Sequence, residues 1–220
     1  MYAVFSFGVR MQNSSISRLT TYGFLGLALS VLSYFLLDEK FYHLTRSTDD
    51  AAREIWNIIT DMGSSAWMVA VTLPLWIIAL GVARLKPENP RWIKLSRRSL
   101  FVFAAFAIPG IFTMIVKGIV GRARPYLFDT EGPTGFNPLS FDSIYASWPS
   151  GHTTTAFAFA IAIVLLAPRL IWVAIPLAIL AGYSRMALSA HYLGDVIMGA
   201  TIGTLGAILV FRWLAPKLKI

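Results

Sequence analysis

The chain has 220 residues, of which 56% are hydrophobic and 14% are charged, and it carries a formal net charge of +8. Its mean hydropathy of +0.65 is too high for an ordinary soluble domain of this length, so we expect a membrane protein. The sequence contains no cysteine, which excludes disulfide frameworks and thiolate metal sites.

Charged residues are sparse and clustered, and they leave six long uncharged stretches. A helix needs about 20 mostly apolar residues to cross a bilayer. The first stretch is too long for a signal-peptide core and lacks a small-residue cleavage site, so it is interpreted as an uncleaved anchor. The pattern predicts an all-α, single-domain bundle over residues 1–220, with six transmembrane helices at about 19–37, 62–83, 99–116, 151–168, 170–186 and 194–211. The last three stretches are short, so their helices must include flanking polar residues.

The segment at 48–60, between the first two spans, is predicted to form an amphipathic helix. Thr48 is its expected N-cap, and Asp49 and Asp50 suit its first turn. Packing on the bundle is favoured over a place in the membrane interface that shapes lipid entry. The residues expected to share one face are Ala52, Ile55, Trp56 and Ile59.

Six spans place both termini on one side of the membrane, together with the loop 84–98 and Arg169. That side has twelve basic residues and a single acid, Glu88, whereas the other side has seven basic and ten acidic residues. The positive-inside rule therefore predicts cytoplasmic termini. Because topology accounts for the excess charge, we expect no nucleic-acid partner, and no obligate protein partner is evident.

Three polar clusters are expected on the outward side. In "KGIVGRARP", Lys117 closes the third span, Arg122 and Arg124 follow, and Pro125 is expected to stop the helix. Lys and Arg often anchor helices at interfaces, but positive residues should be scarce on this side. The cluster opens the motif loop 117–150, the longest irregular segment predicted.

The second cluster is Pro149–Ser150–Gly151–His152, at the start of the fourth span. A Pro, a Ser cap and a Gly are usual at a helix start, but this explanation leaves His152 unaccounted for. Gly151 permits close backbone approach, and amides at a helix start form an anion site.

The third cluster, "SRMALSAHYLGD", contains Arg185, His191 and Asp195. If this stretch is helical, the i, i+4 spacing lets the carboxylate bond one imidazole nitrogen and leaves the other basic. Two histidines, one carboxylate and several cations on one membrane face describe a phosphate site. One imidazole can attack phosphorus while the other protonates the departing oxygen. No acidic cluster is available for magnesium, so we expect no metal and no cofactor.

These clusters resemble those of the type 2 phosphatidic acid phosphatases, the PAP2 family, which share a site with vanadium haloperoxidases. The family pattern is Lys-x6-Arg-Pro, then Pro-Ser-Gly-His, then Ser-Arg-x5-His-x3-Asp, and every position is matched between Lys117 and Asp195. Three ordered motifs with fixed spacings are far more specific than any one of them.

The resemblance implies that His191 is a nucleophile forming a phosphohistidine, that Asp195 orients it, and that His152 is the general acid. The residues implied to hold the phosphoryl oxygens are Lys117, Arg124, Ser150, Gly151 and Arg185. Arg122 lies outside the pattern and is assigned a secondary role or a lipid-headgroup contact.

The sequence thus favours a metal-independent lipid phosphatase of a bacterial cytoplasmic membrane, with its site on the outer face. Candidate substrates are undecaprenyl diphosphate, phosphatidylglycerol phosphate, phosphatidate and lipid A 1-phosphate. Among these, undecaprenyl diphosphate or a broad range of bacterial lipid phosphates is favoured. Three alternatives stay open: a lipid-to-lipid phosphotransferase, a vanadate-dependent peroxidase and a proton-coupled lipid transporter. The clustering of polar residues at one face argues against the transporter.

Overall fold

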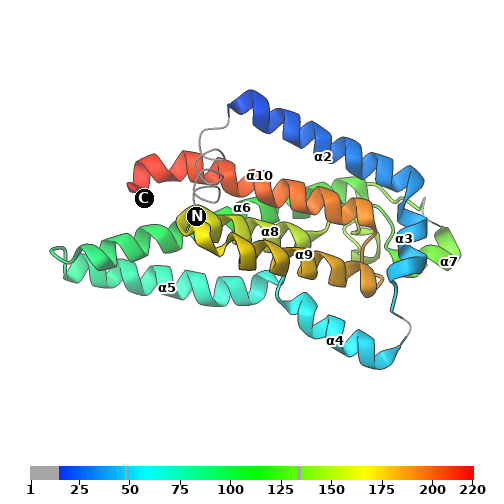
Figure 1. The fold of residues 1–220 in the computed structure, drawn as a ribbon, viewed down its shortest axis with the longest axis horizontal. Coiled ribbons are helices and arrows are strands. Elements are labelled where there is room, and N and C mark those ends of the chain that lie inside the picture. The colour runs from blue at the N-terminus through cyan, green and yellow to red at the C-terminus, as the bar shows by residue number, and fades with distance from the viewer. Residues whose placement is uncertain (1–14, 48, 133–134) are drawn as a thin grey trace.

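The computed structural model describes residues 15–47, 49–132 and 135–220, and its regular structure over these ranges is helical (Figure 1). This confirms the predicted all-α class. The long helices are α2 (Ile16–Leu36), α5 (Ser65–Leu85), α6 (Pro90–Val120), α8 (Gly151–Leu166), α9 (Ile171–Ala187) and α10 (Leu193–Leu218). The short ones are α3 (Asp38–Thr45), α4 (Asp50–Asp61), η1 (Pro125–Leu127), α7 (Phe128–Glu131), η2 (Ser143–Tyr145) and η3 (Pro168–Leu170).

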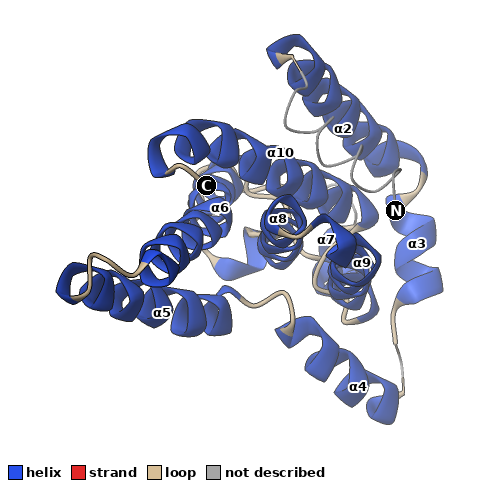
Figure 2. Ribbon diagram, turned by 60° about the vertical axis from the view of Figure 1, so that its left-hand side comes forward, coloured by secondary structure: helices blue, strands red, loops and turns tan. Residues whose placement is uncertain are grey.

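Helix α8 lies at the centre of the bundle and packs against α6, α9 and α10 (Figure 2). Alanine recurs at every second position from Ala156 to Ala162, and these small side chains let the neighbouring helices approach closely. Helix α5 packs on the outer side of α6, and α2 packs on α10. The main apolar core lies between α6, α8 and α10, around Phe101, Phe106, Ile161 and Ile208.

Among the described residues, five apolar helical stretches are long enough to cross a membrane, and together with α8 they overlap the six expected spans. Helix α8 has only 16 residues. Helix α6, by contrast, has 31 residues and is about 46 Å long, because it begins at Pro90 and not near residue 99. The Asn89 side chain caps it by accepting a hydrogen bond from the Arg91 amide at 3.1 Å. The basic run expected in a loop is therefore the helix's first turns.

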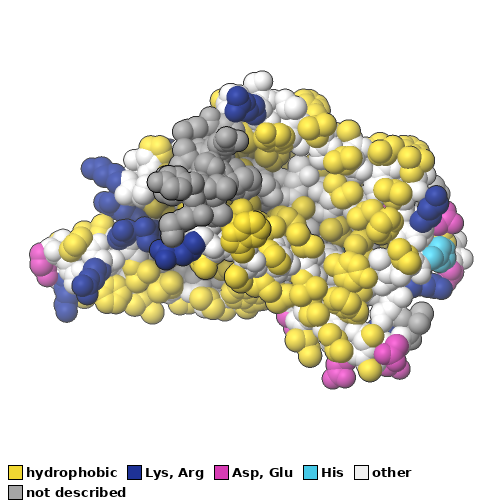
Figure 3. Space-filling model, in the orientation of Figure 1, with side chains coloured by type: hydrophobic (Ala, Val, Ile, Leu, Met, Phe, Trp, Pro, Cys, Tyr) yellow, Lys and Arg dark blue, Asp and Glu magenta, His cyan; other side chains and the backbone are white. Residues whose placement is uncertain are grey.

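The surface matches a bilayer in its distribution of side chains (Figure 3). Large apolar side chains are exposed along the outer helices, including Phe24, Leu25, Val71, Ile77 and Val173. Lys and Arg gather at the end formed by the α5–α6 connection and the C-terminus, whereas Asp and Glu lie mostly at the opposite end and on α4. This separation follows the two sides predicted from the sequence.

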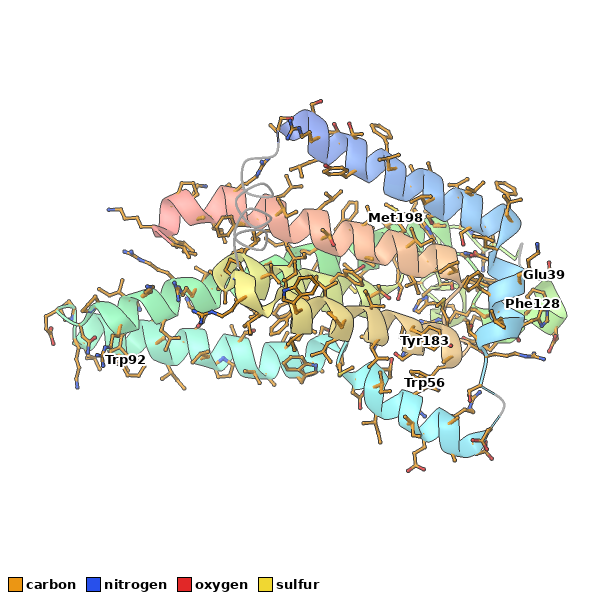
Figure 4. All side chains as sticks on the ribbon, viewed as in Figure 1. Glu39, Trp56, Trp92, Phe128, Tyr183 and Met198 are labelled. Atoms are coloured by element: carbon orange, nitrogen blue, oxygen red, sulfur yellow. The ribbon has the colours of Figure 1, made fainter. Side chains whose placement is uncertain are left out.

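Helix α4 packs against α9, and its inner face differs in part from the predicted one. Trp56 and Tyr183 approach each other with ring centroids 5.1 Å apart (Figure 4). Ile55, expected on the same face, is 57% exposed. Thr48 lies outside the described residues, and Asp49 is the N-cap, accepting from the Ala52 amide at 2.9 Å.

Three glycines of α10 make close contacts with neighbouring helices. A Cβ on Gly199 would lie 2.6 Å from the Ser150 carbonyl oxygen, and a Cβ on Gly206 would lie 2.7 Å from Pro109 Cβ. A Cβ on Gly203 would overlap the Thr154 carbonyl. The contacts of Gly199 and Gly203 press α10 against α8 and set the distance between their N-termini, where the polar residues lie, and the contact of Gly206 presses α10 against α6.

Candidate active site

The motif residues lie where four helix ends meet: the C-termini of α6 and α9 and the N-termini of α8 and α10. Lys117 is in the last turn of α6. The helix ends at Gly121 (φ 64°), whose amide donates to the Lys117 carbonyl at 2.9 Å. Pro125 was expected to stop this helix. It instead begins η1, because the left-handed Gly121 ends α6 earlier.

The Pro-Ser-Gly-His motif forms the N-terminus of α8. Ser150 is the N-cap, and its Oγ accepts from the Thr153 amide at 3.4 Å and from Thr153 Oγ1 at 2.9 Å. The Ser150 amide donates to the Asp195 carbonyl at 3.0 Å, which ties α8 to α10. Gly151 faces Lys117, whose Nζ lies 3.8 Å from the position a Cβ would take.

His191 and Asp195 meet, but not through the helical spacing that the sequence suggested. Helix α9 ends at Ala187, and His191 lies in the connection before α10 begins at Leu193. Asp195 is in the first turn of α10 and accepts from the Tyr192 amide at 2.9 Å. Its Oδ2 lies 3.6 Å from His191 Nδ1, an ion-pair distance that is longer than a hydrogen bond.

The surroundings of His191 keep its imidazole neutral at physiological pH. The residue is 3% exposed, and burial is the main cause that lowers the pKa of His191 to about 3. The positive charges of Lys117 and Arg124 lower it further, whereas Asp195 opposes them. A neutral imidazole has the free lone pair that a nucleophile requires.

Three cations are positioned around this point. Arg124 Nε donates to the Ser143 carbonyl at 2.8 Å, and Arg185 Nη1 donates to Thr60 Oγ1 on α4 at 2.7 Å. The positive charges of Arg124 and Arg185 both repel the positive charge of Lys117. Burial also lowers the pKa of Arg124. Such a concentration of positive charge favours an anionic ligand.

Arg122 does not have the place expected of a headgroup contact. Its side chain is 2% exposed, and its guanidinium pairs with Asp195 Oδ1 at 2.6 Å and with Asp38 Oδ2 at 2.8 Å. The sequence interpretation is corrected here, because two buried carboxylates draw this cation inward and away from lipid.

Two residues around Asp195 were not predicted from the sequence. Ser147 Oγ donates to Asp195 Oδ2 at 2.5 Å, and Asp38 reaches the cluster from the α2–α3 corner. Asp38 did carry one signal, since it is an acid that directly follows an apolar span.

A cavity of about 520 Å³ leads away from the site between α5, α6 and α8. Its polar end is lined by Lys117, Gly151, His152 and Thr155. The rest is mostly apolar and includes Val69, Phe103, Ala107, Ile111 and Met114. The arrangement suits a ligand with an anionic head and an apolar tail.

Comparisons with known proteins agree with this chemistry. The PAP2 superfamily matches residues 98–219. Lipid A 1-phosphatases of Rhizobium etli and Rhizobium johnstonii are both 33% identical, over 70% and 69% of this chain and 67% and 63% of theirs. The bacitracin transport permease protein BcrC of Bacillus licheniformis is 34% identical over 51% of this chain and 57% of its own length.

The fold is also found in a solved structure. A PAP2 type phosphatidylglycerolphosphate phosphatase from Bacillus subtilis matches with a TM-score of 0.51 and 20% identity, covering 96% of this chain and 94% of the other. The chain therefore belongs to the PAP2 superfamily, as its three motifs predicted, and is a phosphoric-ester hydrolase built as an integral membrane protein.

Proposed function

We propose that the chain removes the terminal phosphate of a membrane lipid through a phosphohistidine at His191. The observation that carries this proposal is a buried, neutral His191 beside Asp195, with the charges of Lys117 and Arg124 acting on it and an apolar cavity that begins at Lys117. The cations receive the phosphate, and the cavity receives the lipid tail.

The reaction has two displacements at phosphorus. Because Nδ1 faces Asp195, the other ring nitrogen of His191, Nε2, attacks, and the bond from phosphorus to the lipid oxygen breaks. His152 donates a proton to that oxygen as it leaves. Water then attacks the phosphohistidine, His152 takes a proton from this water, and the P–N bond breaks to release inorganic phosphate.

The remaining residues act on charge. Lys117, Arg124 and Arg185 hold the three phosphoryl oxygens, helped by Ser150 and the amide of Gly151, and they stabilise the negative charge of the transition state. Asp195 faces Nδ1 of His191 and stabilises the positive charge of the imidazole once phosphorus is bound.

Among lipids we favour lipid A 1-phosphate, because two relatives at 33% identity are lipid A 1-phosphatases. The sequence alone favoured undecaprenyl diphosphate, and the same site accepts either head. The basic end of the bundle supports cytoplasmic termini, and we therefore propose that the site faces outward from a bacterial cytoplasmic membrane.

The test is phosphate release by detergent-purified protein with EDTA present, across lipid A, undecaprenyl diphosphate, phosphatidylglycerol phosphate and phosphatidate. We expect release to survive chelation and His191→Ala to lower it at least about 1,000-fold. His43→Ala is the matched control, since His43 is exposed on α3, and it should behave as the wild type. Full activity in His191→Ala contradicts the mechanism, and a phosphorylated second lipid in place of free phosphate identifies a phosphotransferase.

A further inference from the structure

The buried ion cluster behind Asp195 has no part in the reaction described so far. We propose that Asp38 and Arg122 are positioning residues for His191: Arg122 fixes Asp195, and Asp38 shares the charge of Arg122 so that Asp195 is held without being neutralised. This inference rests on the proposed function, because it assigns Asp38 and Arg122 an effect on the nucleophile.

The cluster is closed to solvent and rigid. Arg122 bridges Asp195 and Asp38 through its two terminal nitrogens, and the side chains are 2%, 0% and 0% exposed. The rings of Tyr192 and Tyr34 lie with their centroids 4.1 and 4.9 Å from Arg122 Cζ. A guanidinium between two aromatic rings has little freedom to turn.

Asp38 is fixed as firmly as Arg122. Its Oδ1 accepts from Ser33 Oγ on α2 at 2.6 Å and from the Gly194 amide on α10 at 2.8 Å. Ser30 Oγ in turn donates to the Gly194 carbonyl at 2.7 Å. Asp38 therefore binds the first turn of α10 next to Asp195, although it comes from the other end of the chain.

The charge balance explains why two acids face one arginine. Burial disfavours the guanidinium charge, but Asp195 and Asp38 outweigh it and raise the pKa of Arg122, so the cation stays charged. One positive and two negative charges leave a surplus of one negative charge beside His191. That surplus stabilises the positive charge that the imidazole acquires as its Nε2 bonds to phosphorus. Without Asp38, Arg122 would neutralise Asp195, and Lys117 and Arg124 would face His191 unopposed.

The first test is Asp38→Asn, which keeps the side-chain volume and one acceptor oxygen but removes the charge. We expect kcat to fall about 10- to 100-fold, as it does when other residues that orient a functional group from behind are changed, and KM to stay within about twofold of the wild-type value. Inhibition by vanadate, which imitates the five-coordinate phosphoryl transition state, should weaken in parallel with kcat. Glu39→Gln removes an exposed acid from the next position of α3 and should change neither value.

Running His191→Ala beside these variants separates the two proposals. Retained activity in His191→Ala defeats the proposed function. Lost activity in His191→Ala together with wild-type kcat and vanadate inhibition in Asp38→Asn defeats only the positioning role.

The second test is Arg122→Met, alone and combined with Asp38→Asn. Arg122→Met leaves two unneutralised buried carboxylates, so its loss should exceed that of Asp38→Asn. Adding Asp38→Asn then removes one of those charges and should recover activity several-fold. Losses that multiply in the double variant would show that Asp38 and Arg122 act independently of each other, and that result would overturn the inference.

Discussion

At the scale of single residues, the nucleophilic role proposed for His191 depends on its burial. An exposed imidazole would be protonated in part near pH 6.5, and a protonated ring has no lone pair for phosphorus. The protein keeps the ring neutral by closing it from water and by placing Lys117 and Arg124 within electrostatic reach. The same burial makes the folded state sensitive to acid.

We predict that His191 destabilises the protein as pH falls through the range from about 6.5 to about 3. The pKa of His191 is lowered in the folded state, so the unfolded chain binds more protons in this range and gains stability relative to the folded chain. The free energy of unfolding is therefore unaffected by His191 above pH 6.5, and below this pH it falls by about 1 kcal/mol for each pH unit of acidification.

Unfolding in detergent, measured from pH 7 to pH 4, checks this slope. His191→Gln cannot take up the proton, and its stability should fall less steeply than that of the wild type. His43→Gln, at an exposed histidine, should follow the wild type. Parallel curves for wild type and His191→Gln would show that the buried imidazole is not the acid-sensitive group.

Sequence spacing singles out the three motifs, each of which is a short run of chain at or just beyond helix ends. It could not predict Asp38, whose contact with Arg122 depends on how the α2–α3 corner docks on α10. The misassignment of Arg122 has the same origin, since a cation on an outward loop looks like a lipid contact until its buried partners are known.

At the scale of helices, the sequence predicted spans that overlap α2, α5, α6, α8, α9 and α10, because uncharged length and apolar character define a bilayer-crossing helix. It placed the start of α6 too late, since charged residues mark the edge of the membrane and not the end of a helix. Asn89 and Pro90 are the start signals that the charge pattern obscured.

Gly203→Ala should destabilise the bundle by about 1 to 3 kcal/mol, since the added methyl meets backbone atoms of α8 that cannot move aside. It would lie 3.0 Å from the Ala158 nitrogen and closer still to the Thr154 carbonyl. Gly81→Ala is the control: Gly81 is on an exposed face of α5 with nothing within 4 Å of the new Cβ. That change should be neutral or stabilising by up to about 1 kcal/mol.

Thermal unfolding of both variants in one detergent decides the point. The prediction requires a lower midpoint for Gly203→Ala and an unchanged or higher one for Gly81→Ala. Equal midpoints would mean that α10 can move away from α8 without cost, and the close contact would then have no part in holding the two N-termini of the site together.

At the scale of the whole molecule, an apolar cavity lies between the candidate phosphate site and the part of the bundle that is expected to cross the bilayer. Residues of α5, α6 and α8 line the cavity, and Lys117 and His152 lie at its polar end. No sequence pattern predicted this space, because it depends on how far α5 and α6 separate. If a lipid tail lies there, then filling the cavity should affect lipids and spare small phosphate esters.

Ala107→Trp places a large ring in the apolar part of the cavity, away from Lys117 and His152. We expect KM for a long-chain lipid phosphate to rise by about tenfold, equivalent to about 1.4 kcal/mol of lost binding. The KM for a phosphate ester with four-carbon chains should stay within about twofold of the wild-type value, because the phosphate head of this ester still reaches the cations. Ile108→Trp, at the next position and 46% exposed on the outer face of α6, is the matched control and should spare both substrates. An equal loss for long and short esters in Ala107→Trp would show that the cavity serves folding and does not hold the lipid tail.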